Sequence, residues 1–116
     1  METFTVDLTF EEAKNTIKEF VLHEGASTEC VAEYEQEAQD GKKAVFLVFE
    51  KYYMRNSSRA SLSIIIENLK GETKVCAVGS GGGSSALFKF DWGTANNFAN
   101  VAREAVKGHI LGEKQG

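Results

Sequence analysis

The residues from Val78 to Gly93, VGSGGGSSALFKFDWG, are the first place in the chain to look for chemistry. A glycine-rich turn after a strand can cradle a phosphate, because its backbone N–H groups approach the ligand closely. Gly81, Gly83 and Ala86 match the dinucleotide-binding pattern G-x-G-x-x-G/A. That pattern requires a helix to start at the glycines, whereas the following LFKFDWG alternates like a strand. A Walker loop requires a lysine directly after its last glycine, and none follows before Lys89.

A phosphate cradle is therefore the weakest of three interpretations of Gly81, Gly82 and Gly83. We favour a turn or bulge with positive φ angles, which glycine tolerates at no steric cost. The third interpretation is a loop that closes over a ligand on the concave side of a sheet.

Asp91 and Trp92 follow the glycines and precede the last amphipathic segment. Asp91 could cap a helix that starts there, and Trp92 could anchor the loop over the core. We favour this structural role. In the functional alternative Trp92 is a stacking wall of a pocket, with serine hydroxyls of the glycine-rich stretch as donors.

A second candidate site is the segment from Glu50 to Arg59, which carries two phenols and two arginines: Tyr52, Tyr53, Arg55 and Arg59. A guanidinium offers a planar fork of donors, so this group could hold an anion. Cross-strand pairs flanking a solvated turn explain the same residues without a ligand, and we favour that interpretation.

Two segments, EKYYMRNSSRASLSIII and VGSGGGSSALFKFDWG, resemble a family of short bacterial proteins that is classed only as a domain of unknown function. The similarity covers most of the chain, from the first strand into the last helix. The resemblance implies an α+β fold and a bacterial cytosolic protein. It implies no substrate and no catalytic residue, so no role is transferred to any position.

Histidines and cysteines are few and are not spaced for a metal. His23 and His109 lie near expected helix C-termini, where the helix dipole favours a cation. Cys30 and Cys76 form no C-x-x-C pair, and we expect both to be buried as small hydrophobes. We expect no metal and no cofactor. No G-x-S-x-G elbow supports a serine nucleophile.

The composition is that of an ordinary water-soluble domain. The chain has 116 residues, of which 42% are apolar and 26% charged. Its formal net charge of −4 argues against nucleic acid and anionic membranes as partners. No apolar run approaches the ~20 residues of a membrane span, and the acidic start lacks the pattern of a signal peptide. We expect one cytoplasmic domain over residues 1–110, with a flexible tail at 111–116.

The N-terminal part predicts a strand followed by a helix. Residues 3–8 alternate, with Phe4, Val6 and Leu8 on one side. Thr9 and Glu12 form the pattern of a capping box, and apolar residues then recur at helical spacing over 10–23.

Residues 28–38 fit either a helix or a strand, and Asp40-Gly41, a strong hairpin signal, favours the strand. In that strand Cys30, Ala32 and Tyr34 would share the inner face, and the glutamates would be solvated on the other. Residues 43–54 are apolar on both faces, which predicts a central strand of the sheet. Further strands are expected at 59–69 and 73–79, with a short one at 86–90, and a helix at 94–107.

These elements predict an α+β fold, a two-layer sandwich with an antiparallel meander of about five strands and two helices on one face, in the order β-α-β-β-β-β-α. The most probable function is non-catalytic binding of an unknown small molecule or protein partner. The expected site lies between the glycine stretch and the tyrosine-rich hairpin. Its candidate residues are Tyr52, Tyr53, Arg55, Arg59, Gly81, Gly82, Gly83, Asp91 and Trp92.

Two alternatives stay open. One is an enzyme that acts on a small anionic substrate through Arg55, Asp91 and Tyr52 or Tyr53. The other is a homodimerisation module, in which a strand edge or an exposed aromatic patch pairs two copies.

Overall fold

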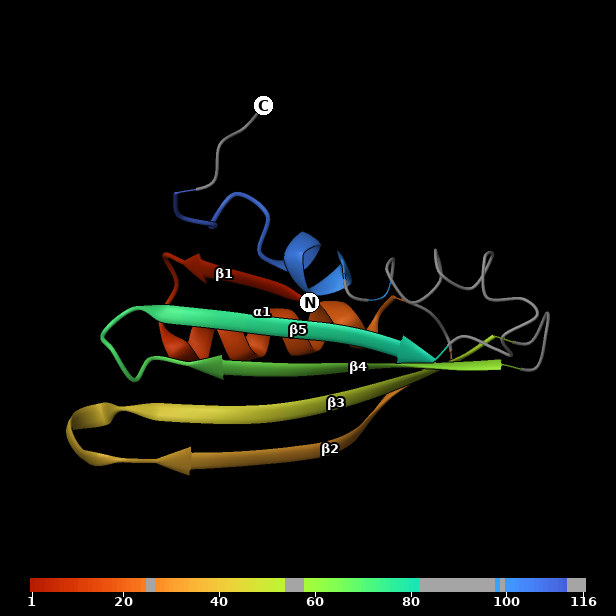
Figure 1. Ribbon diagram of the computed structural model, residues 1–116, viewed down its shortest axis with the longest axis horizontal. Helices are drawn as coiled ribbons and strands as arrows, with labels where there is room; N and C mark the ends of the chain where they lie inside the picture. Colours follow the sequence, from red (N-terminus) through yellow and green to blue (C-terminus); the bar gives the residue numbers. More distant parts are fainter. Residues whose placement is uncertain (25–26, 54–57, 82–97, 99, 113–116) are drawn as a thin grey trace.

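The computed structural model describes residues 1–24, 27–53, 58–81, 98 and 100–112. Five strands form one antiparallel sheet, and helix α1 lies behind it in Figure 1. The strands are β1 (Glu2–Val6), β2 (Thr28–Glu37), β3 (Lys43–Tyr53), β4 (Ser58–Glu67) and β5 (Thr73–Gly81). Helix α1 spans Phe10–Leu22, and a 3₁₀ turn, η1, spans Gln39–Gly41. Residues 98 and 100–105 are also helical, and we call this part the C-terminal helix.

The strand order is β1-β5-β4-β3-β2. Strands β2 to β5 form the predicted meander, with each pairing to the next in the chain. Strand β1 does not pair with β2, the strand that follows it in the chain, because α1 connects the two and crosses the sheet. Strand β1 pairs antiparallel with β5 at the opposite edge. The C-terminal segment pairs with β1 in turn. Asp7 N donates to His109 O over 2.8 Å, and Leu111 N donates to Thr5 O over 2.7 Å.

Helix α1 begins where the capping box predicts. The Thr9 side chain accepts from Glu12 N over 3.1 Å, and Glu12 Oε1 accepts from Thr9 N over 3.0 Å. These two bonds satisfy backbone donors that a helix start leaves unpaired. The helix ends at Leu22, with His23 as C-cap. The apolar face of α1 (Phe10, Ala13, Ile17 and Val21) is fully buried.

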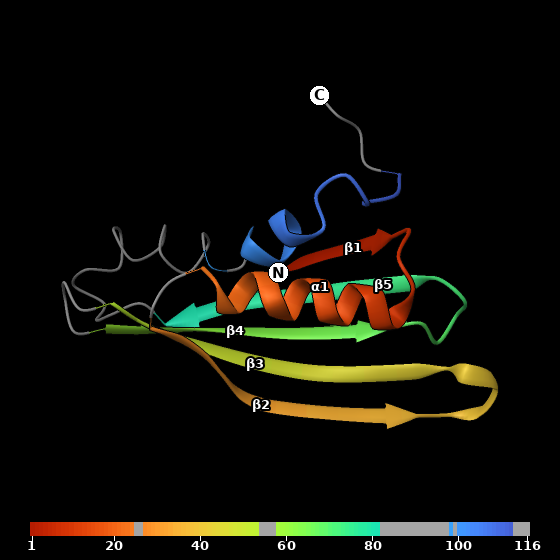
Figure 2. The same ribbon diagram turned by 180° about the vertical axis from the view of Figure 1, so that it is seen from behind.

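The core lies between one face of the sheet and the two helices, which confirms the predicted two-layer α+β arrangement. Figure 2, turned by 180° from Figure 1, shows α1 in front of the sheet. Phe98, Val101, Ala102 and Val106 of the C-terminal helix and the turn after it join the same cluster. The strand residues of the core are Phe4, Val6, Val45, Leu47, Phe49, Ala60, Leu62, Ile64, Ile66, Val75 and Ala77. The helices therefore cover a single face, which we call the inner face.

Strand β2 confirms the choice of strand over helix, but its faces differ from the prediction. The pairing register with β3 shifts between Cys30 and Ala32, which marks a β-bulge at Val31. A bulge inserts one extra residue and so reverses the alternation beyond it. Cys30 therefore packs against the core, whereas Tyr34 lies on the opposite face and is 60% exposed. Beyond the bulge Glu33 and Glu35 occupy inner positions. Their carboxylates form ion pairs with Lys18 and Lys14 of α1.

The β2–β3 hairpin turns at η1, as the Asp-Gly pair predicts. Asp40 and Gly41 both have positive φ angles, 61° and 75°. Asp and Gly are among the residues that tolerate this conformation best, so the turn sets the hairpin register. The C-terminal helix gives way to a turn at residues 106–108, and Gly108 has a φ of 93°. The expected strand at 86–90 and the start of the last helix lie outside the described residues.

Candidate functional site

Four of the predicted site residues lie at one end of the sheet. Tyr52 and Arg59 are direct cross-strand partners on β3 and β4, and Ala60, next to Arg59, pairs with Gly81 on β5. Tyr53 pairs with Ser58 in the backbone register. The remaining candidates lie outside the described residues: Arg55, Gly82, Gly83, Asp91 and Trp92. The site as a whole, and the approach of Arg55 to Asp91 that the enzyme hypothesis requires, therefore stay predictions.

Gly81 has a structural reason to be glycine. Its φ is 88°, and a Cβ atom built on it would lie 2.7 Å from the carbonyl oxygen of Arg59. Such a contact is far inside van der Waals distance, so β5 can approach β4 this closely only without a side chain. The geometry of Gly81 fits the interpretation favoured from the sequence, in which a turn or bulge has a positive φ angle that glycine tolerates.

Arg59 is already paired within the chain. Its Nη1 lies 3.2 Å from Glu50 Oε1, and the Arg59 side chain is 70% exposed. An exposed pair of this kind contributes little to stability, but it means that an anion at Arg59 competes with a carboxylate. Tyr52 is held through its backbone, because Ser27 Oγ donates to Tyr52 O over 2.7 Å.

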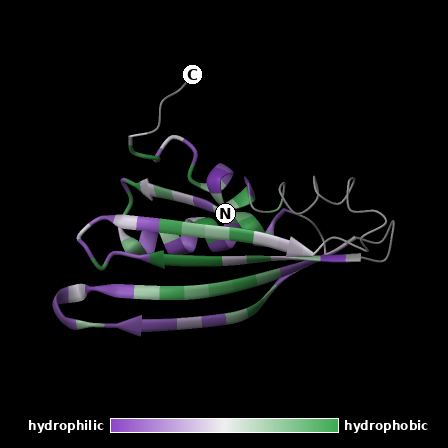
Figure 3. Ribbon diagram, viewed as in Figure 1, coloured by the Kyte–Doolittle hydropathy of each residue, from purple (hydrophilic) through white to green (hydrophobic). Residues whose placement is uncertain are grey.

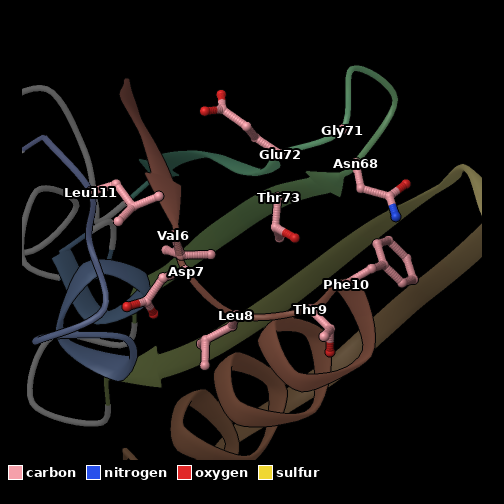
Figure 4. Close-up of a pocket in the computed structure, with 10 residues that line it drawn as sticks. All are labelled: Val6, Asp7, Leu8, Thr9, Phe10, Asn68, Gly71, Glu72, Thr73 and Leu111. Atoms are coloured by element: carbon pink, nitrogen blue, oxygen red, sulfur yellow. The ribbon is translucent and has the colours of Figure 1, made fainter.

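The described residues also form a hollow of ≈ 450 Å³ at the other end of β5 (Figure 4). Its walls come from the β1–α1 turn, the β4–β5 turn and the C-terminal segment. The lining residues are Val6, Asp7, Leu8, Thr9, Phe10, Asn68, Gly71, Glu72, Thr73 and Leu111. Thr73 and Gly81 are the two ends of β5, so the strand rise puts this hollow about 26 Å from the glycine stretch.

The polar groups around this hollow are largely engaged in the fold. Thr9 Oγ1 caps α1, and Asp7 Oδ1 lies 2.8 Å from His109 Nδ1. No group of three His, Cys, Asp or Glu side chains that could hold a metal occurs among the described residues. The hollow offers a ligand neither an uncommitted charge cluster nor more than one aromatic ring.

Ion pairs occupy the helix side of β2 and β3. Lys14 Nζ lies 2.8 Å from Glu35 and 3.2 Å from Glu11, Lys43 Nζ lies 3.1 Å from Glu11, and Lys18 pairs with Glu33. Hydrogen bonds from Lys43 and Lys14 lower the pKa of Glu11, and the bond to Glu35 raises the pKa of Lys14. Each of these six charged side chains has an opposite partner, which indicates a structural layer between helix and hairpin.

The sheet face opposite the helices, which we call the outer face, is the most distinctive surface of the described residues. Successive residues in the middle of β3, β4 and β5 are apolar, so both faces of these strands carry apolar side chains (Figure 3). Neither of the described helices lies over the outer face. Its large side chains are substantially exposed: Tyr34 60%, Phe46 41%, Ile65 43%, Val78 43% and Tyr52 39%.

Three of these exposed side chains, those of Tyr34, Phe46 and Ile65, lie in one row across neighbouring strands. Tyr34, Phe46, Ile65, Cys76 and Thr3 are successive cross-strand partners from β2 to β1. Such a continuous apolar surface is uncommon on a monomeric soluble protein and usually marks an interaction site. The sequence predicts that residues 43–54 are apolar on both faces and that both helices lie on one face of the sheet. Together these two predictions imply an apolar face without a helix, a consequence that the candidate site did not include.

The fold and this surface define a small two-layer α+β domain with one open sheet face. The chain belongs to a family described as a family of unknown function (DUF6054), whose model matches residues 1–110. The expected membership in a family without known function is confirmed. Searches of curated proteins and of solved structures returned no match. No described helix has the length and apolar character that crossing a membrane requires.

Proposed function

We propose that this chain is a non-catalytic binding domain whose outer face docks a protein partner. The single observation that supports this function is the row of apolar side chains that crosses β2 to β5 on the outer face, with no described helix over it. A β-sheet with helices on only one side leaves its other side to water or to a partner. Burying an exposed apolar surface is favourable by roughly 25 cal/mol per Å², so the open face is a source of binding free energy.

The partner is a protein rather than a nucleic acid or an anionic membrane. The charged residues of the outer face are Glu29, Glu50, Arg59, Glu67 and Lys74, which do not add up to a positive surface. Nucleic acids and anionic lipids both reward clustered positive charge. A flat surface with aromatic and aliphatic side chains in its centre and charges at its ends has the layout of a protein interface.

A light-activated crosslinker tests this function. p-Benzoylphenylalanine replaces Phe46 on the outer face in one variant and Phe20 on α1 in the other. The two phenylalanines are matched, with exposed fractions of 41% and 38%. Irradiation of cells that express each variant should give protein adducts at position 46 and not at position 20. Adding Ile65→Lys, next to Phe46, should abolish them.

The proposal fails if neither position gives an adduct, or if both give the same adducts at the same yield. The mass of the adduct also reports what the partner is, without any prior assumption about its identity.

A further inference from the structure

Two neighbouring rows of side chains cross the outer face at right angles to the strands. The large row is the set of cross-strand partners Tyr34, Phe46, Ile65, Cys76 and Thr3. The small row lies two residues further along each strand and consists of Ala32, Val48, Ser63 and Val78. On β2, β3 and β4 the small row is the less bulky one, with Ala beside Tyr, Val beside Phe and Ser beside Ile. On β5 the order is reversed, with Val78 beside the smaller Cys76, so on β2 to β5 a bulkier side chain lies next to a smaller one.

We propose that the outer face docks a second copy of this chain, with the large row of each copy seated on the small row of the other. This inference rests on the proposed function and names its partner. A twofold axis that runs across the strands, between the two rows, produces this arrangement. Two sheets pack face to face about 10 Å apart with interdigitated side chains. Large residues opposite small ones fill that space without voids, which makes the face complementary to itself.

The charges of the face permit this self-association. Glu67 and Lys74 are cross-strand partners at one end, and Glu50 pairs with Arg59 at the other. The twofold axis brings these two ends together across the interface. One end carries Glu67 and Lys74, and the other carries Glu29, Glu50 and Arg59, so a neutral end meets an end with a net charge of −1 and two ends of the same sign never face each other. The large row and the small row, which lie next to the axis, contain only uncharged residues. In the row of Glu50, Ser61 and Ser80 hydrogen-bond each other over 2.8 Å.

The face is also large enough. Five strands spaced about 4.8 Å apart, with the four rows that the axis superposes about 6.7 Å apart, give on the order of 650 Å² per copy. The two copies together would bury about 1,300 Å², which falls in the standard size range of specific protein interfaces.

The edges of the sheet are less suitable for pairing two copies. Strand β2 carries Glu29, Glu33, Glu35 and Glu37, so two antiparallel β2 edges would bring like charges together. At the other edge, the backbone of Thr5 of β1 and of Asp7 just after it already bonds the C-terminal segment. The face rather than an edge is therefore the surface where a second copy fits.

Sedimentation equilibrium of the purified chain tests the inference. We expect a mass of twice 12.7 kDa at high concentration, with dissociation on dilution. Phe46→Lys should raise the dissociation constant at least about tenfold, because it puts a charge into the large row. Phe20→Lys, an equally exposed aromatic on α1, should leave it unchanged. A monomer mass at every concentration, or equal effects of the two substitutions, overturns the inference.

Ser63→Trp separates the specific arrangement from simple stickiness. A tryptophan in the small row adds apolar area but fills the space where the large row of the partner sits. The specific dimer predicts weaker association, by at least about tenfold. A non-specific apolar patch predicts equal or stronger association, and this outcome overturns the inference. Circular dichroism melts of each variant confirm that it is folded before its mass is interpreted.

The crosslinking experiment distinguishes the two failures. If the purified chain is a monomer but position 46 is crosslinked to a different protein, the inferred dimer is wrong and the proposed docking function stands. If the chain is a monomer and position 46 gives no adduct, both are wrong.

Discussion

Glu2 and Arg103 are 101 positions apart in the chain, and they form a two-pronged contact between β1 and the C-terminal helix. Arg103 Nη2 and Nε donate to Glu2 Oε1 over 2.7 Å and 2.9 Å. The guanidinium also lies 4.9 Å from the centroid of the Phe4 ring. The first and last described elements are thus joined by a charge-assisted hydrogen bond and a cation–π contact at the same side chain.

Replacing Arg103 tests what this contact contributes. Arg103→Gln should lower the free energy of unfolding by about 1–2 kcal/mol, because a partly buried carboxylate loses its partner and Phe4 loses the cation. Arg103→Lys should recover only part of this, since an ammonium lacks the planar fork. Urea unfolding checks both variants, with Glu104→Gln on the same helix as an exposed control. Equal stability of the Lys and Gln variants would show that the fork geometry is unimportant.

The lowered pKa of Glu11 predicts a contribution to stability that is lost in acid. Lys43 and Lys14 lower its pKa in the folded state, so the folded state binds the proton less well than the unfolded state. The stabilisation is therefore present above the unfolded pKa and is lost as the pH falls through the folded pKa. Because Glu11 is about half exposed, we expect only a few tenths of a kcal/mol.

Thermal melts from pH 7 to pH 3 check this contribution (about the range in which carboxylates titrate). Glu11→Gln should lose less stability on acidification than the natural chain, and the difference should shrink in high salt. Glu24→Gln, an exposed carboxylate after α1, is the control. Parallel curves for the natural chain and Glu11→Gln would contradict the assignment.

Gly81 predicts a steric penalty that differs from that of other glycines with positive φ. Gly81→Ala places its Cβ against the Arg59 carbonyl and should cost roughly 2–4 kcal/mol, from backbone strain plus displacement of β4. Gly71→Ala is the matched control. Gly71 has a φ of 96° but nothing within 4 Å of an added Cβ, so its cost should be about 1 kcal/mol. The difference between the two midpoints in urea measures the clash, and equal costs would exclude it.

The local signals in the sequence predict most of the elements. Thr9 and Glu12 mark the start of α1 because a capping box satisfies specific backbone donors. Asp40-Gly41 marks the β2–β3 turn because few other residue pairs adopt its conformation at low cost. Both signals act over a few residues, so they can be recognised without the tertiary structure.

The faces of the strands were harder to predict. The bulge at Val31 leaves no composition signal, yet it moves Tyr34 from the inner to the outer face. The exposure of Phe46 depends on where the helices lie, and that is a property of the whole fold. A glutamate-rich strand pattern also fits solvent, whereas Glu33 and Glu35 in fact meet lysines of α1. These contacts join positions far apart in the chain, which periodicity within one segment does not report.

Cys76 provides a test of the proposed dimer that requires no substitution. Its thiol lies in the large row of the outer face and is partly exposed, whereas Cys30 packs against the core on the inner face. If the large row is buried against a second copy, alkylation of Cys76 by iodoacetamide should slow as protein concentration rises through the dissociation constant. The rate at Cys30 should stay constant, and mass spectrometry of tryptic peptides separates the two sites. In Phe46→Lys the rate at Cys76 should no longer depend on concentration. A rate at Cys76 that is the same in dilute and concentrated solutions of the natural chain would leave the large row uncovered, and the dimer would be wrong.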